Sequence, residues 1–178
     1  MFKHVKDSQI TISELMLPSH SNFSGKIHGG YILGLMDQIA FACASKHSRT
    51  YCVTASVEKV NFLNPIEVGE LVTLKASINY VGRTSMVVGI RVEAENIHTG
   101  DIKHCNSSYF TMVAKDDDGN PKEVPGLILS KTEHARRFAK VIIRNKIIKV
   151  RKMEFTQENF NLEEHIDILK KSNVKVEL

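Results

Sequence analysis

One acidic side chain stands out because it interrupts a long apolar segment. From about His28 to Ser45, apolar residues occur on nearly every face of a predicted helix, which is typical of a buried helix, and Asp37 lies inside it. A lone carboxylate in an apolar core is costly, so Asp37 must reach a cavity, a partner chain or a buried donor. Desolvation would make it a stronger base than a carboxylate in water, whereas a structural cap or ion pair is the alternative.

The residues that precede this helix could assist such a base. Gly29 and Gly30 lie where the chain enters the helix, and exposed N–H groups at a helix start favour developing negative charge. The amide of Asn22 could orient a water molecule. His28 stands beside the helix start, where a histidine more often caps the turn than takes part in chemistry. Cys43, among apolar neighbours, is typical of an inert core thiol.

The elements around this helix are predicted to be strands. Alternating or β-branched patterns predict five of them, joined by short turns, with Gly82-Arg83-Thr84 as a hairpin connection between the third and fourth. The expected ranges are Gln9–Leu17, Tyr51–Phe62, Leu71–Gly82, Met86–Ala94 and Lys103–Ala114. Antiparallel strands with one apolar face, and one long apolar helix to cover it, define an α+β fold in which the sheet wraps the helix.

The C-terminal part has a different composition. Residues 131–178 carry 12 basic and 7 acidic side chains, whereas residues 1–130 carry 12 and 13. Ser130 and Glu133 form a capping-box pattern that opens a predicted helix from about Lys131 to Lys152, and a short helix is possible near Glu163 to Lys171. We therefore expect one domain at residues 1–130 and a basic helical extension at residues 131–178.

Several classes of protein are disfavoured by composition. No stretch approaches the roughly 20 apolar residues of a membrane span, and the first residues lack the apolar core of a secretory signal. Three widely spaced cysteines suggest neither a disulfide framework nor a zinc site, so a cytoplasmic location is expected. The acidic loop at residues 116–121 lacks the ligand spacing of an EF-hand. Nucleic-acid binding has little support without a recognised motif.

Four segments carry a family resemblance. In order, they are NFSGKIHGGYILGLMDQIA, VTASVEKVNFLNPIEVGELV, NYVGRTSMVVGIRVEAEN and SSYFTMVAKDDDGNPKEVPGL. Together they resemble the hotdog-fold acyl-CoA thioesterases of the YciA and brain acyl-CoA hydrolase group, over about residues 10–127. The resemblance implies a long central helix gripped by an antiparallel sheet, two subunits pairing edge to edge, and commonly three such pairs in a hexamer with active sites at the pair interface.

The resemblance also implies roles for individual residues. It makes Asp37 the catalytic carboxylate, with Asn22 contributed by the other subunit of the pair. Backbone N–H groups near Gly29 and Gly30 would polarise the thioester carbonyl. His28 is a catalytic candidate only through its place beside the helix start, and the resemblance assigns it no role. Asp37 would deprotonate a water or attack to form a transient anhydride, and the sequence leaves both open. No metal or cofactor is required, because a thiolate is a good leaving group and coenzyme A belongs to the substrate.

The hairpin is the predicted binding site for coenzyme A. The family binds coenzyme A near the loop matched by residues 81–85, so phosphate and pantetheine contacts are expected from this loop, although an ordinary hairpin is the alternative. The candidates are Val81, Gly82, Arg83, Thr84 and Ser85.

The role of the C-terminal extension stays open, and two functions other than hydrolysis are alternatives. The basic helix is a departure from simpler family members; it could reach over the nucleotide end of coenzyme A, pack on a neighbouring subunit, or cover the domain with a solvated basic face. A hotdog domain could also bind acyl-CoA without hydrolysing it, as a lipid sensor would. The His with Glu or Asp of hotdog dehydratases is not matched, and Asp37 favours hydrolysis.

Overall fold

A computed structural model describes residues 1–154 and 174. Met1–Val141 form one compact unit and Ile142–Leu178 form a second. The helices and strands are, in chain order, β1 (Phe2–His4), α1 (Val5–Ser8), β2 (Ile10–Leu15), a 3-10 turn (Pro18–His20), α2 (Gly29–Ser48), β3 (Tyr51–Val57), β4 (Leu71–Val81), β5 (Ser85–Glu95), β6 (Ile102–Lys115), β7 (Gly126–Ile128) and α3 (Thr132–Glu154). No helix in the part of the chain that is described is long and apolar enough to cross a membrane.

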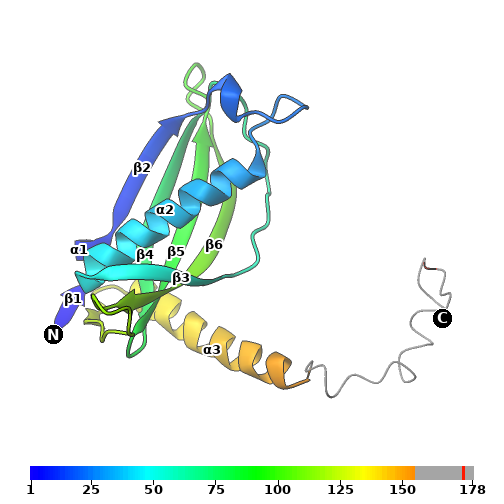
Figure 1. The fold of residues 1–178 in the computed structure, drawn as a ribbon. Coiled ribbons are helices and arrows are strands. Elements are labelled where there is room, and N and C mark those ends of the chain that lie inside the picture. The colour runs from blue at the N-terminus through cyan, green and yellow to red at the C-terminus, as the bar shows by residue number, and fades with distance from the viewer. Residues whose placement is uncertain (155–173, 175–178) are drawn as a thin grey trace. The chain divides into compact units, whose positions relative to one another are not determined.

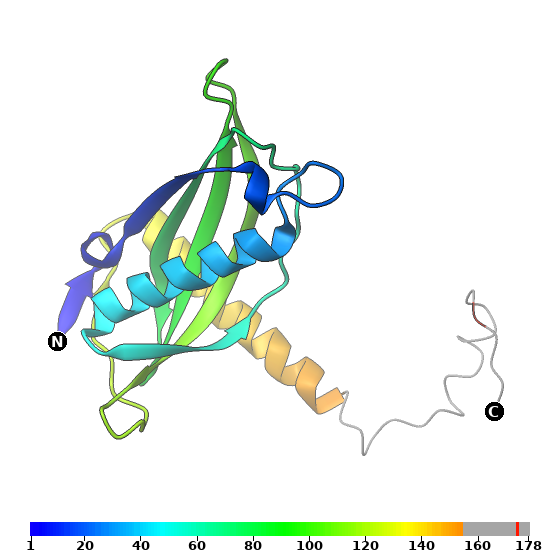
Figure 2. The same ribbon diagram turned by 45° about the horizontal axis from the view of Figure 1, so that its top comes forward.

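The main sheet has five antiparallel strands in the order β2-β4-β5-β6-β3. It curls around α2, which lies across its concave face (Figures 1 and 2). This arrangement confirms the predicted α+β fold with a sheet wrapped around one long helix. Strands β2 and β3 form the two edges, so β3, which follows α2 directly, presents one row of backbone groups without a partner strand within the described residues.

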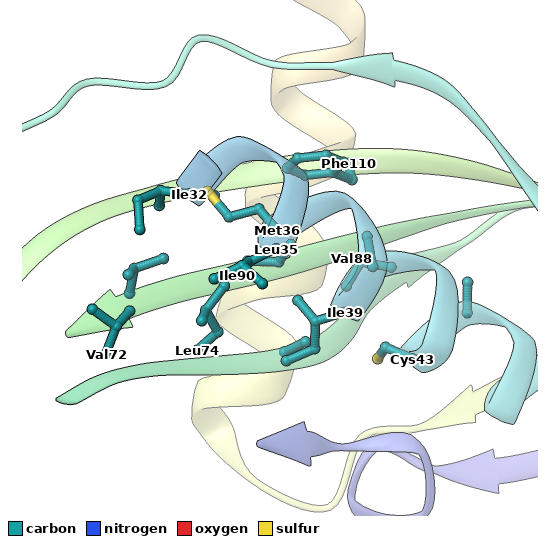
Figure 3. Close-up of a cluster of buried hydrophobic side chains, with 14 of the residues drawn as sticks. Ile32, Leu35, Met36, Ile39, Cys43, Val72, Leu74, Val88, Ile90 and Phe110 are labelled. Atoms are coloured by element: carbon teal, nitrogen blue, oxygen red, sulfur yellow. The ribbon is translucent and has the colours of Figure 1, made fainter. Parts of the chain in front are cut away.

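The core lies between the inner side of α2 and the concave face of the sheet. Alternate residues of β4 and β5 point inward, as their period of two predicts, and meet side chains spaced three or four apart on α2. Figure 3 shows this cluster, whose labelled members are Ile32, Leu35, Met36, Ile39, Cys43, Val72, Leu74, Val88, Ile90 and Phe110. Each fully buried Val, Leu, Ile, Met or Phe side chain of this cluster contributes about 1.5–3 kcal/mol of hydrophobic stabilisation.

The prediction that α2 is buried on every side is wrong for the single chain. The exposed residues Gly30, Gly34, Asp37, Gln38 and Phe41 recur at intervals of three or four and form one stripe along the helix. We call this set the open stripe of α2. The sheet of one chain wraps only part of the helix circumference. Part of the apolar surface of α2 therefore stays exposed to solvent in a single chain.

Other differences from the predicted elements are local. The expected strand at Tyr51–Phe62 ends at Val57, and β1, α1 and β7 were not predicted. Helix α3 starts at Thr132, and the Glu133 carboxylate accepts hydrogen bonds from Arg136 and Arg137, so the predicted capping box with Ser130 does not form. The possible helix near Glu163 to Lys171 lies outside the described residues.

Candidate active site

Asp37 and a threonine of the neighbouring edge strand form the centre of the candidate site. Thr54 on β3 donates a hydrogen bond from Oγ1 to Oδ1 of Asp37 at 2.6 Å. Both residues are exposed in the single chain. A break in register between Thr54 and Ser56 marks a bulge in β3, a feature that often re-aims side chains beside active sites. The Asp37 carboxylate is thus oriented by a hydroxyl, and the chain by itself does not remove it from water.

A hollow of about 400 Å³ adjoins this pair. It is lined by α2 and β3 residues, namely Asp37, Gln38, Phe41, Tyr51, Cys52, Val53 and Thr54. The rings of Phe41 and Tyr51 meet edge to face at 5.7 Å, and their side chains remain 40% and 63% exposed. An apolar wall beside a carboxylate suits a group with a polar reacting centre and an apolar chain.

The start of α2 is organised by His28. Its Nδ1 accepts a hydrogen bond from the Gly30 N–H at 3.2 Å, so His28 is the N-cap of the helix, as the sequence predicted for a histidine beside a helix start. A substrate oxygen that uses the Gly30 N–H must therefore displace this ring. Gly29 has a structural role as well, because a Cβ there would lie 3.2 Å from the Phe62 ring.

Asn22 lies in the loop before α2, where its side-chain oxygen organises a tight turn. Oδ1 accepts hydrogen bonds from Ser24 N at 2.9 Å, Ser24 Oγ at 2.7 Å and Lys26 N at 3.2 Å. Phe23, at the tip of this turn, is fully exposed. Within residues 1–154, no hydrogen bond joins Asn22 to Asp37. The single chain therefore does not bring these two candidates together.

The β4–β5 hairpin lies at the level of Thr54 in the sheet, two strands away. Ser85 pairs with Val113 on β6, and Val113 pairs with Val53 on β3, which places the hairpin roughly 10 Å from β3 at about 4.8 Å per strand. The hairpin is closed by Gly82 N–H to Ser85 O at 2.8 Å, and the carbonyl groups of Arg83 and Thr84 accept hydrogen bonds from Val124 N and Ala114 N. Its backbone is thus fixed, while the Arg83 side chain is exposed to solvent.

Sequence reasoning missed Thr54. A threonine in a β-branched strand is an ordinary residue, and only the curl of the sheet over α2 shows that it contacts Asp37. Its place in the second family-like segment was the one available signal. In the part of the chain that is described, no group of three or more His, Cys, Asp or Glu side chains could hold a metal ion.

Known proteins share this fold and these segments. Residues 24–100 match the family model of the Thioesterase superfamily. Protein VdlD of Helicobacter pylori is 46% identical over 118 residues, which cover 66% of this chain and 67% of VdlD. A solved apo-hexameric acyl-CoA thioesterase is 35% identical with a TM-score of 0.82, covering 85% of this chain and 97% of its own.

A third relative extends over the C-terminal region. An acyl-CoA hydrolase of Staphylococcus aureus, solved with butyryl coenzyme A, coenzyme A and coenzyme A disulfide, is 28% identical with a TM-score of 0.79, covering 96% of this chain and 99% of its own. It has also been solved as separate variants in which an Asp, a Thr or an Asn is replaced by Ala. A long helix wrapped by a curled antiparallel sheet is the hotdog architecture. The chain belongs to the hotdog-fold acyl-CoA thioester hydrolases and is an acyl-CoA thioesterase.

Proposed function

We propose that this thioesterase cleaves acyl-CoA with Asp37 as its general base or nucleophile, in a site that two copies of the chain build together. The observation that carries the proposal is the separation of the required groups along α2. Gly30 and Asp37 are seven residues apart, so their backbones lie about 10 Å apart at about 1.5 Å per residue. A carbonyl must lie about 3 Å from both its attacking group and its oxyanion donors. The Asp37 carboxylate is therefore not adjacent to the Gly30 N–H of its own chain, which favours oxyanion donors from a second copy.

The open stripe of α2 and the free edge of β3 support pairing with a second copy. Both lie beside Asp37, and the exposed apolar side chains there include Phe41, Tyr51 and Val57. An edge strand that follows the catalytic helix can extend the sheet into a second chain, which would cover the stripe. The N-terminal turn of the partner's α2, with its own Asn22, Gly29 and Gly30, then belongs to the site.

The spacing of three polar residues gives independent support. In the S. aureus hydrolase, the Asn and Asp replaced in the separate variants are 15 residues apart, and the Asp and Thr are 17 apart. Asn22, Asp37 and Thr54 have the same two intervals. This supports the assignment of Asn22 and Thr54 as partners of Asp37, with Thr54 orienting the carboxylate and the Asn22 amide orienting water.

The chemistry needs one base and one oxyanion site. As general base, Asp37 takes a proton from water while the water oxygen bonds to the thioester carbon; as nucleophile, its own oxygen forms that bond and water later cleaves the anhydride. In either route the carbonyl oxygen gains negative charge, which N–H groups at Gly29 and Gly30 stabilise. The C–S bond then breaks and coenzyme A leaves as a thiolate. His28 caps the Gly30 N–H in the single chain and would have to release it when that N–H binds the oxyanion.

The β4–β5 hairpin is the proposed binding site for coenzyme A. Arg83, Thr84 and Ser85 offer a guanidinium and two hydroxyl groups for phosphate and pantetheine, and Val81 and Gly82 shape the turn that presents them. A hexamer built from three dimers and a cytoplasmic location are further parts of the proposal; the hexameric relative supports the first.

The decisive experiment is turnover by Asp37→Asn. The wild-type chain and the variant are incubated with acyl-CoA of several chain lengths, and released thiol is followed with a thiol reagent. We expect a loss of at least about 100-fold, the size usual when a principal acid or base is removed. A variant of unchanged rate would overturn the assignment of Asp37. If the wild type binds acyl-CoA and releases no thiol, the chain is a non-catalytic acyl-CoA binder.

A further inference from the structure

A second cavity, of about 450 Å³, lies on the face of the main sheet turned away from α2. It is bounded on one side by the first turns of α3, all within the unit Met1–Val141. This volume lies in the range of small-molecule sites. Asp37 and its hollow lie on the other side of the sheet, so this cavity takes no part in the proposed hydrolysis.

The floor of this cavity is polar because it is built from the outward residues of four strands. The register aligns one row across the sheet, Thr11, Lys75, Arg91 and Ser107, and beside it a second row, Ser77, Gly89 and Tyr109. The Asn79 side chain packs against Gly89, where a Cβ would come within 2.1 Å of the Asn79 amide nitrogen. Ser77 Oγ donates to Asn79 Oδ1 at 3.1 Å, and both residues are only 6% exposed.

One face of α3 forms the wall. Glu133, Arg136, Arg137 and Lys140 are spaced three, four and seven residues along the helix, so all four side chains point toward the sheet. Packing holds this face in place: the Phe138 ring lies 4.9 Å from that of Tyr80, and Val141 is fully buried. Arg137 also reaches the floor, with Nη1 3.4 Å from Ser77 Oγ.

Positive charge exceeds negative charge in this cavity. Lys75 and Arg91 share the single carboxylate of Glu93 at 2.6 and 2.7 Å, and Arg136 and Arg137 share that of Glu133 at 2.6 and 2.7 Å. Within the residues described, Lys140 has no acidic partner. The five cations are thus opposed by two carboxylates.

The cations are also placed to receive a ligand. The side chains of the four paired cations are 41–55% exposed, so they can meet an incoming anion without unfolding any element. Hydrogen bonds from Arg136 and Arg137 hold the pKa of the Glu133 carboxyl down at about 2.

We propose that this outer cavity binds a small molecule that carries two or more phosphate groups, at a site separate from the catalytic one. Phosphate suits the lining because guanidinium groups pair with it in a fixed geometry and serine hydroxyls complete its hydrogen bonds. Two or more linked phosphates can also contact the excess cations on both the sheet and α3. The source of the phosphates is a free nucleotide or the nucleotide end of a coenzyme A molecule bound away from the catalytic site.

Calorimetric titration of the full chain tests this site. The probes are inorganic tripolyphosphate, ADP and coenzyme A. We expect one tripolyphosphate per chain, with affinity falling as salt is raised from about 0.05 to 0.3 M and the screening length shortens. Lys140→Gln should weaken binding by about tenfold, the worth of one charge-assisted hydrogen bond. Glu133→Gln should tighten it by about threefold, because one opposing charge is removed.

The opposite signs of these two changes separate a binding role from a structural one. Lys6→Gln removes an exposed lysine that does not line the cavity and should leave the affinity unchanged. Sensitivity of ADP binding to Lys140→Gln assigns the site to free nucleotides, and sensitivity of coenzyme A binding alone assigns it to coenzyme A. The proposal is overturned if no probe binds, if both cavity variants bind like wild type, or if Arg83→Gln alone removes binding.

Discussion

The hydrogen bond from Thr54 to Asp37 gives the sharpest test of how the site is oriented. Thr54→Val keeps the β-branched shape and removes the hydroxyl that donates to the carboxylate at 2.6 Å. A hydrogen bond to a charged group is worth about 1.5–3 kcal/mol net. If that stabilisation holds Asp37 in its reactive rotamer, and each 1.36 kcal/mol changes a rate about tenfold, the variant loses about tenfold to a hundredfold in kcat.

The assay is thiol release from a saturating acyl-CoA, followed over a range of substrate concentrations. The loss should fall on kcat and leave KM nearly unchanged, because Thr54 acts through Asp37 and not on the bound substrate. Thr54→Ser restores the hydroxyl and should restore most of the rate. Thr73→Val is a matched control, because it removes a hydroxyl that hydrogen-bonds to the Ser13 hydroxyl at 2.8 Å on the exposed outer face of the sheet. Full activity in Thr54→Val, or an equal loss in Thr54→Ser, would refute the orienting role.

Two further predictions concern assembly and pH. A side chain at position 34 would meet open space in the single chain, so Gly34→Arg should fold with an unchanged circular dichroism spectrum. The arginine should nevertheless block pairing of two chains. A variant that is dimeric by light scattering and active in turnover would contradict the shared site. Burial lowers the pKa of His47, whose Nε2 lies 2.9 Å from Pro125 O, so the unfolded chain takes up the proton first and stability is lost as pH falls below about 6.5. In urea unfolding, His47→Gln should lose up to about 1.4 kcal/mol per pH unit of this dependence as the pH falls below about 6.5, whereas a slope equal to that of wild type would show that other groups cause it.

The sequence predicted the elements whose information is local. Strands β4 and β5 alternate cleanly because one face packs on α2, and helix α2 was found to within a few residues. By contrast, β1 pairs with β7, more than 120 residues away, and is tied to the end of α2 by Lys3 Nζ to His47 O at 2.5 Å. Three-residue strands held by such distant contacts leave no periodic pattern in their own residues.

The candidate site divides in the same way. Asp37 could be predicted because a carboxylate in an apolar helix is chemically unusual, and His28 because a helix start needs a cap. Thr54 could not, since nothing in its own strand distinguishes it from a surface threonine. The open stripe of α2 was hidden for a different reason: an apolar face covered by a second chain has the same residue types as one covered by the chain's own sheet.

This hidden stripe reconciles two observations that otherwise conflict. An acid in an apolar helix should be desolvated to act as a base, yet Asp37 is exposed in the single chain and hydrogen-bonded to the edge strand. Both hold if the cover comes from a partner. One pairing event would then exclude water from the carboxylate and bring in the partner's oxyanion donors, whereas those of the same chain lie about 10 Å away along α2. The polar residues of the sheet's outer face need no such cover: Ser77 and Asn79 are already buried under α3. Pairing is therefore proposed for the chemistry of the inner face, whereas the residues that line the outer cavity all come from one chain.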